Sequence, residues 1–391
     1  MPWNLRLAAA CIFSLTGLLA AFRPPTYHLW KLSVPIREAG HWMVAPCLIL
    51  AWMSFRSGIP GRIAGGMFLL AAALFGMTLA RACFTARNVS REFAAAWGPI
   101  PPPSGGFLRT SPLDLIDLFR GIPLPAARPE TFAYARAAGS ELKLDFYRAR
   151  PDAGRAPCIL MLHGGGWDSG SRDQFPELNA FLAGAGYAVA SLDYRLAPGS
   201  TYPAPVEDVR AALDWLKANA ERLGLDAGRF VLAGRSAGGQ IALQSAYLSG
   251  DPAVMAAIAF YAPADMVLGY RYPCSPWVLD SPRLMAAYLG GSGDLTPLAR
   301  NASPLEHISP RVPPTLLLHG RPDVICTWEH TAHMREGLER AGARHFEVDL
   351  PWAPHGYDYV FRGPGSQISL YILERFLAAV TRGSEASVRR D

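Results

Sequence analysis

The sequence has few of the features that bind metals, redox cofactors and nucleotides. Its six cysteines include no C-x-x-C pair, and no Cys/His set has zinc-site spacing, so we expect neither a disulfide framework nor a structural metal. The glycine run at 164–166 lacks the Lys-Ser or Lys-Thr ending of a phosphate-binding loop. The net charge of +5 comes without any run of Lys or Arg, which argues against nucleic-acid binding. The sequence therefore predicts no cofactor, no metal and no nucleic-acid partner, and it leaves the oligomeric state open.

Apolar residues, in contrast, are abundant. They make up 50% of the 391 residues and the mean hydropathy is positive, which is high for a soluble enzyme. Three uncharged apolar stretches, 7–22, 39–55 and 63–80, approach the roughly 20 residues that a membrane-spanning helix needs. We therefore expect a three-helix transmembrane domain over residues 1–96. The alternatives are a buried helical bundle, or a signal peptide followed by buried helices.

The basic residues between these stretches predict their orientation. With the N-terminus outside, six Lys or Arg residues lie inside and three lie outside, and cytoplasmic loops carry the excess of positive charge. We expect an integral protein of a bacterial-type inner or plasma membrane, with its catalytic domain in the cytoplasm. Cleavage of the first stretch would remove this argument.

The rest of the chain divides into a linker and a larger unit. Residues 97–129 combine a Pro/Gly-rich segment with a short amphipathic helix near Leu113, Ile116 and Phe119, which either packs on the larger unit or lies on a membrane surface. Residues 130–391 alternate apolar strands with helical patterns. Such alternation predicts an α/β fold with a mostly parallel sheet and helices on both faces.

The most informative motif is Gly-Arg-Ser-Ala-Gly-Gly at 234–239. It follows an apolar strand and precedes a helical pattern, as in the strand–turn–helix elbow that presents a nucleophilic serine. The glycines suit the tight turn, which would lift the hydroxyl of Ser236 above the sheet. An ordinary turn serine is the simpler alternative, but three companion motifs favour the nucleophile.

The first companion is the run His-Gly-Gly-Gly-Trp at 163–167, directly after another apolar strand. Acyl transfer generates an oxyanion, which requires preorganised N–H donors. The backbone amides of Gly165 and Gly166, together with that of Ala237 after the serine, are the candidates for this oxyanion hole.

The other two companions are an acid and a base in the chain order Ser…Asp…His of an α/β-hydrolase. Asp323 and His355 each follow a predicted strand. His355 would take the proton of Ser236, and Asp323 would orient the imidazole and stabilise its cation. Asp349 also lies near a strand end, but only six residues before His355, so Asp323 is the preferred acid.

Aromatic residues near the same sheet edge are candidates for the substrate pocket. A long irregular stretch between the strands ending at Ala262 and starting at Thr315 predicts part of a cap over that pocket. The candidate pocket residues are Trp167, Tyr194, Trp277, Tyr288 and Trp352.

At its motifs the chain resembles a known family. The segments 163–167, 193–198 (Asp-Tyr-Arg-Leu-Ala-Pro) and 234–239 look like those of hormone-sensitive-lipase-type and related carboxylesterases of the α/β-hydrolase superfamily. The resemblance covers about residues 130–380, and it implies hydrolysis of carboxylic esters of modest acyl length without a cofactor. Many relatives have Asp before the nucleophile, whereas this chain has Arg235, as is seen more in feruloyl-esterase-like and prenylcysteine-methylesterase-like branches.

Three functions are compatible with these patterns. The first is a membrane-anchored serine hydrolase acting on small-molecule or lipid esters, such as acylglycerols or prenyl-cysteine methyl esters. The second is an acyltransferase that uses the same triad and passes the acyl group to an alcohol or amine. The third is a non-enzymatic ligand receptor on an esterase scaffold, which the presence of His355 disfavours.

Overall fold

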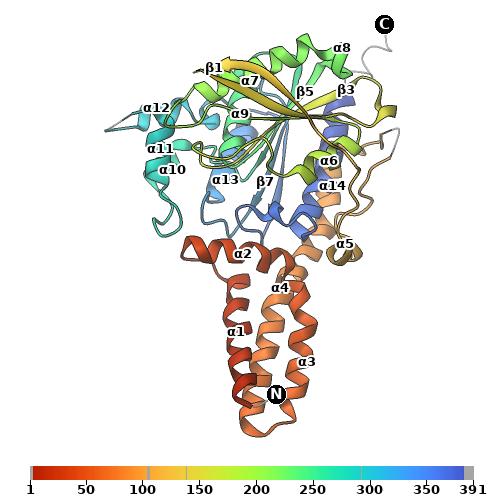
Figure 1. Cartoon of the computed structure of the whole chain (residues 1–391), viewed down its shortest axis with the longest axis vertical. Coiled ribbons are helices and arrows are strands. Elements are labelled where there is room, and N and C mark those ends of the chain that lie inside the picture. The colour runs from red at the N-terminus through yellow and green to blue at the C-terminus, as the bar shows by residue number, and fades with distance from the viewer. Residues whose placement is uncertain (1–2, 104–105, 138, 292, 383–391) are drawn as a thin grey trace.

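The computed structural model describes residues 3–103, 106–137, 139–291 and 293–382, and it has two parts joined by one long helix (Figure 1). In the first part three helices lie side by side as a narrow stalk, and α2 lies across the end of the stalk that is nearer the sheet. Helices α1 and α3 both pack against α4. The elements of this part are α1 (Trp3–Ala21), α2 (Tyr27–Ala39), η1 (Gly40–Met43), α3 (Val44–Phe55) and α4 (Gly58–Trp97).

The stalk has small residues inside and large apolar residues outside. Ala10, Ala51 and Ala64 are buried around Phe68, so the helices approach closely. Helices α1 and α4 are long and apolar enough to cross a membrane, whereas α3 is shorter. A water-soluble bundle would turn its large apolar side chains inward. Here many of them are exposed, among them Leu15, Leu18, Leu48, Ile49, Trp52, Ile63, Leu69 and Leu70.

Helix α4 is longer than its apolar stretch. It continues beyond residue 80 to Trp97, where Gly98 ends it with a φ of 75°. The second half of α4 is helical because it packs on the larger unit: Phe93 contacts Phe346 with ring centroids 5.0 Å apart, and Trp97 contacts Phe376 at 5.1 Å. The irregular segment thus begins one residue later than expected, and its residues 104–105 lie outside the described chain.

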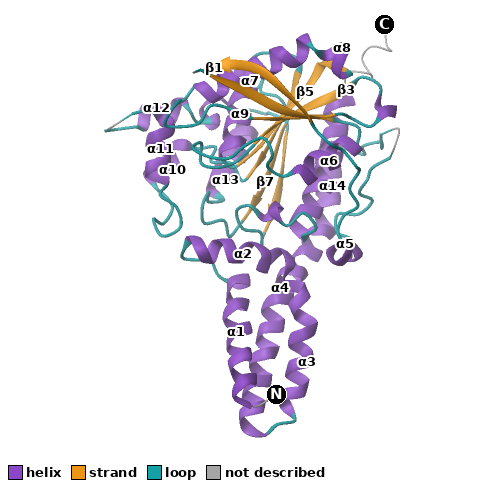
Figure 2. Ribbon diagram, viewed as in Figure 1, coloured by secondary structure: helices purple, strands orange, loops and turns teal. Residues whose placement is uncertain are grey.

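An eight-stranded sheet forms the centre of the second part, with the order β1-β2-β4-β3-β5-β6-β7-β8 (Figure 2). The pairs β1–β2 and β2–β4 are antiparallel, and all later pairs are parallel, as the strand–helix alternation predicts. The sequence did not distinguish β1 as a separate strand. The strands are β1 (Glu130–Ala137), β2 (Ser140–Tyr147), β3 (Ala156–Leu162), β4 (Ala188–Leu192), β5 (Leu225–Arg235), β6 (Val254–Phe260), β7 (Thr315–Gly320) and β8 (His345–Leu350).

Helices cover both faces of the sheet because strand residues alternate between two apolar cores. Leu160 faces one core and its neighbour Ile159 faces the other. Helices α7 (Ala204–Ala218), α8 (Ala220–Leu223), α9 (Ala237–Ser249) and α13 (Glu329–Arg340) contribute to the first core, and α6 (Pro176–Gly184), α14 (Pro364–Arg382) and the end of α4 contribute to the second.

The stretch between β6 and β7 folds into short helices beside the carboxyl end of the sheet, as Figure 1 shows. These are α10 (Met266–Arg271), α11 (Ser281–Leu289), α12 (Thr296–Asn301) and η3 (Pro304–His307). Earlier in the chain, α5 (Leu115–Arg120) buries Leu118 but exposes Ile116 and Phe119. It packs against η1, where Trp42 donates a hydrogen bond to the carbonyl of Leu118 (3.3 Å). The remaining short turns are η2 (Pro151–Ala153) and η4 (Tyr357–Tyr359).

Candidate active site

Ser236 occupies a strained turn between β5 and α9. Its φ is 51°, a left-handed value that a residue with a side chain seldom adopts. Around this turn β3, β5 and α9 pass so close to one another that two positions can hold only glycine. A Cβ on Gly234 would overlap the carbonyl oxygen of Gly238, and one on Gly238 would overlap that of His163. This close crossing of β3, β5 and α9 holds the Ser236 hydroxyl at the sheet edge.

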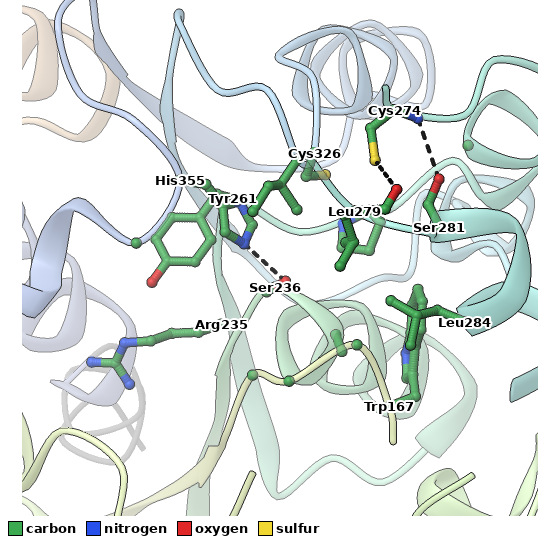
Figure 3. Close-up of a pocket in the computed structure, with 18 of the residues that line it drawn as sticks. Trp167, Arg235, Ser236, Tyr261, Cys274, Leu279, Ser281, Leu284, Cys326 and His355 are labelled. Carbon is green, nitrogen blue, oxygen red and sulfur yellow. Dashed lines mark hydrogen bonds between the residues drawn. The ribbon is translucent and has the colours of Figure 1, made fainter. Parts of the chain in front are cut away.

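The structure brings Ser236, His355 and Asp323 together in one hydrogen-bonded chain. His355 Nε2 lies 3.0 Å from Ser236 Oγ, a contact that is drawn as a dashed line in Figure 3, and His355 Nδ1 lies 2.7 Å from Asp323 Oδ2. Asp323 follows β7 and His355 follows β8, so neighbouring parallel strands deliver both groups to one edge. This geometry allows the imidazole to accept the serine proton while the carboxylate orients it.

Asp323 is fully buried and its carboxylate is surrounded by donors. The backbone N–H groups of Ile325 and Cys326 donate to Oδ1, at 2.8 and 2.9 Å, and His319 Nε2 lies 3.2 Å from Oδ2. Burial by itself would raise the pKa of Asp323. The charge of His355 and hydrogen bonds from His319 and His355 outweigh it, so the pKa lies well below its usual range.

The alternative acid, Asp349, is engaged elsewhere. Both of its oxygens accept hydrogen bonds from the guanidinium of Arg321, at 2.8–2.9 Å, on the exposed side of β8. The structure therefore joins Asp323, and not Asp349, to the imidazole of His355.

The glycine run after β3 lies beside the same serine, since a Cβ on Gly164 would be 3.5 Å from the Cβ of Ser236. Gly165 has a φ of 126°, and a Cβ there would overlap the carbonyl oxygen of Ser169. Within the described chain, the N–H groups of Gly165, Gly166 and Ala237 donate to no other protein group. All three residues line the cavity that contains Ser236. Their amides are therefore free to bind an oxygen atom of a ligand.

Ser236 and His355 open into a cavity of about 300 Å³. The expected cap supplies one wall through Leu279, Leu284 and Met285, and Figure 3 shows Leu284 close to Trp167. Most of the cavity surface is therefore apolar, with the serine, the imidazole and the amides at one side. Such a cavity suits a small ester with apolar substituents.

Of the five aromatic residues predicted for the pocket, Trp167 lines the cavity, whereas Tyr194, Tyr288, Trp352 and Trp277 are not among the residues that line it. Tyr194 lies behind the glycine run, where its ring stacks on His163 and its hydroxyl donates to the carbonyl of that residue. Tyr288 stacks on the back of Trp167. Trp352 is a fully buried residue of the loop between β8 and His355, and Trp277 lies on the outer surface, 77% exposed.

Among the cavity residues that were not predicted, two come from the N-terminal part of the chain. Tyr27 and Trp30 of α2 line the cavity, and Trp30 Nε1 donates a hydrogen bond to the backbone carbonyl of His355 (3.1 Å). In the sequence both residues have the pattern of interfacial aromatics at the end of an apolar stretch. Nothing in the local sequence connects them to the serine motif.

Arg235, which stands where many relatives have Asp, is only 2% exposed. Its side chain points away from Ser236 in Figure 3, and its Nε donates to the carboxylate of Asp358. The hydroxyl of Tyr261 donates to the same carboxylate, and the guanidinium lies 3.8 Å from the ring centre of Phe175. A buried ion pair thus supports the turn beneath the serine.

No group of three or more His, Cys, Asp or Glu residues within the described ranges could hold a metal ion.

Comparisons with known proteins agree with this architecture. A family model described as BD-FAE matches residues 144–338. The probable carboxylic ester hydrolase LipM of Mycobacterium tuberculosis is 28% identical, over 71% of this chain and 67% of LipM. The esterase LipC of the same organism is 30% identical over 52% of this chain and 53% of LipC. The chain thus spans two thirds of the length of the first relative and about half of the second.

Solved structures of esterases are also similar. Esterase 2 of Thermogutta terrifontis, phosphonylated by sarin, has a TM-score of 0.56 and 27% identity, and the match covers 65% of this chain and 95% of that one. The Pyrobaculum calidifontis esterase has the same TM-score and 25% identity, over 66% of this chain and 86% of its own. These similarities support a carboxylic ester hydrolase activity and confirm the resemblance and the fold inferred from the motifs. The chain belongs to the carboxylesterases of the α/β-hydrolase superfamily.

Proposed function

We propose that this chain is a membrane-anchored serine hydrolase that cleaves carboxylic esters through Ser236, His355 and Asp323. The observation that carries the proposal is the hydrogen-bonded chain of these three side chains at the wall of an apolar cavity. The esterase names of the relatives and neighbours support the reaction class.

In the first half of the proposed reaction, Ser236 Oγ attacks the carbonyl carbon of the ester while His355 Nε2 takes the hydroxyl proton. The carbonyl π electrons move to its oxygen, which becomes an oxyanion. The amides of Gly165, Gly166 and Ala237 would stabilise that charge. The tetrahedral intermediate then collapses, and His355 gives its proton to the departing alcohol, which leaves an acyl-serine.

In the second half, water replaces the alcohol. His355 removes a proton from the water as it attacks the acyl-serine, and the same oxyanion site receives the charge. Collapse breaks the bond to Ser236 Oγ, which recovers the proton from His355, and the carboxylic acid leaves. The low pKa of Asp323 keeps its carboxylate ionised throughout, opposite the imidazolium that forms in each half.

The outward-facing apolar surface of the stalk supports a membrane anchor. Lipid would cover side chains such as Leu15, Ile49 and Leu70, which water would otherwise contact. Residues 1–96 would form this anchor, 97–129 the connection, and 130–391 the catalytic domain, of which 383–391 lie outside the described chain.

The proposed substrate is a lipophilic ester from the membrane. The cavity wall nearest the stalk is α2 itself, through Tyr27 and Trp30, so the site is close to the proposed membrane surface. We place the catalytic domain in the cytoplasm, because six of the nine counted basic residues of the N-terminal part belong to its side of the stalk.

The experiment that tests this function is hydrolysis of p-nitrophenyl esters from acetate to palmitate by the detergent-purified protein and its Ser236→Ala variant. We expect hydrolysis by the wild-type protein and loss of roughly 10³-fold or more in the variant. No turnover of any ester, or undiminished turnover by the variant, would contradict the proposal. Adding an alcohol and measuring the ester product distinguishes hydrolysis from acyl transfer.

A further inference from the structure

Helix α2 contacts the loop that carries His355, although 325 positions separate Trp30 from that histidine. Trp30 Nε1 donates to the His355 carbonyl at 3.1 Å, and the indole and imidazole centroids are 6.2 Å apart. Trp30 therefore holds the backbone of His355, whereas Asp323 holds its imidazole.

Two helical turns after Trp30 in α2, Arg37 connects the stalk to the same loop. Its guanidinium donates to the carbonyls of Leu19 (2.8 Å) and Phe22 (2.7 Å) at the end of α1, and to the carbonyl of Trp352 (2.9 Å). Carbonyls at the end of a helix have no partner within that helix, so a cation stabilises them. Arg37 thus ties the end of α1 to the residue three positions before His355.

The next residue, Glu38, is fully buried and holds the loop at two points. Its Oε1 accepts the indole N–H of Trp352 (2.9 Å), and its Oε2 accepts the backbone N–H of Gly365 (2.8 Å). A Cβ on Gly363 or Gly365 would come within 2.5–3.1 Å of this carboxylate or its side chain. The loop is therefore closely fitted around Glu38, and a buried donor that lost this acceptor would remain unsatisfied.

Positions 30, 37 and 38 share one face of a helix, because they are seven and eight residues apart. They contact the chain before, at and after the base of the triad, namely at Trp352, His355 and Gly365. We infer that Trp30, Arg37 and Glu38 are positioning residues for His355. This inference rests on the proposed serine hydrolase function, and it makes α2 part of the catalytic apparatus as well as of the anchor.

A distinct kinetic result follows. Ser236 and the oxyanion amides are positioned by the ends of β3 and β5 and the start of α9, whereas the hydrogen bonds of Arg37 and Glu38 to the larger unit reach Trp352 and Gly365, in the loop around His355. Relaxing the loop would therefore move His355 Nε2 away from Ser236 while most of the cavity keeps its shape. The proton transfer would suffer more than substrate binding, so kcat should fall while KM changes little.

The test uses the full-length protein in detergent with the variants Glu38→Gln and Trp30→Phe. Glu38→Gln keeps an oxygen for Trp352 but presents an NH₂ group to the Gly365 amide, and Trp30→Phe removes only the N–H donor and part of the ring. The control is Leu32→Ala, a residue of the same helix that is 53% exposed. For each protein we would measure kcat and KM for p-nitrophenyl butyrate, the rate of Ser236 labelling by a fluorophosphonate, and the melting temperature.

We expect kcat and the labelling rate to fall roughly tenfold in Glu38→Gln and severalfold in Trp30→Phe, with KM within about twofold, and Leu32→Ala to match the wild type. Unchanged kcat in both folded variants would overturn the inference. A proportional loss of kcat and gain in KM with a lower melting temperature would also overturn it, because it would indicate a general structural role. If Glu38→Gln does not fold, Trp30→Phe decides. Loss of activity in Ser236→Ala alongside fully active α2 variants would leave the proposed function intact and refute only this inference.

Discussion

The backbone carbonyl of His355 accepts a hydrogen bond from the indole of Trp30, while the His355 imidazole lies 2.7 Å from Asp323. The base of the candidate triad is thus held from two sides by segments from opposite ends of the chain. The side-chain contact belongs to the α/β-hydrolase fold, and the backbone contact belongs to the N-terminal part. Replacements on each side should therefore have different effects.

The acid should be Asp323 and not Asp349. We expect Asp323→Asn to reduce kcat by roughly 10³-fold or more, because the amide cannot stabilise the imidazolium. Asp349→Asn removes only an exposed pair with Arg321 and should change kcat less than about twofold. Ester hydrolysis by the two variants, purified in parallel, provides the comparison. A severe loss of kcat in Asp349→Asn together with an active Asp323→Asn would show that Asp349 is the acid.

The amide of Gly166 should contribute to oxyanion binding. Its φ is 60°, and a Cβ there would lie 2.8 Å from the side chain of Leu284, so Gly166→Ala should displace the amide and reduce kcat by roughly tenfold or more. Gly224→Ala is the matched control, because Gly224 has a φ of 72° and no atom near its Cβ position. It should lower the melting temperature but leave kcat unchanged. Equal kcat values for both variants would argue against the oxyanion role.

Glu38 should make stability depend on pH. Burial raises the pKa of Glu38 to about 8, and the unfolded value is near 4.5. Because the folded pKa is the higher one, the folded state holds its proton more tightly. The contribution of this proton to the free energy of unfolding is complete below about pH 4.5 and is lost as the pH rises through about 8.

Urea denaturation of the wild type and Glu38→Gln at pH 5.5, 7 and 8.5 measures this effect. The free energy of unfolding of the wild type should fall with pH relative to that of the variant, which has no proton to lose at this position. Parallel curves for the two proteins would mean that Glu38 does not titrate in this range.

The stalk should remain in the membrane. We expect the full-length protein, expressed in bacteria, to stay with the membrane fraction after an alkaline carbonate wash, since lipid covers the apolar outer surface of α1, α3 and α4. N-terminal sequencing of the same sample should find residues of α1 still present. Recovery in the soluble fraction, or a chain that begins after Ala21, would favour the buried-bundle or signal-peptide alternatives.

The sequence predicted the sheet and the order of the candidate catalytic residues because each depends on local patterns. Strand periodicity, the glycines around Ser236 and the chain order Ser…Asp…His are all visible without knowing which segments touch. The choice between Asp323 and Asp349 also followed from the position of each residue relative to its strand.

Packing between distant segments could not be predicted in the same way. Tyr194 and Trp352 are close in sequence to the motifs, but hydrogen bonds to His163 and Glu38 hold them outside the cavity. Conversely, Tyr27 and Trp30 look like interfacial aromatics, and only the crossing of α2 over the sheet edge brings them to the cavity. The helical extension of α4 to Trp97 likewise depends on partners from β8 and α14.

Whether Ser236 is the nucleophile of an ester hydrolase is tested by covalent labelling of the wild-type protein with a fluorophosphonate, followed by mass spectrometry and an ester hydrolysis assay on the same sample. We expect one label per chain, located on Ser236, with hydrolysis falling in proportion to the labelled fraction. A label on another residue, or hydrolysis that persists when Ser236 is fully labelled, would contradict it.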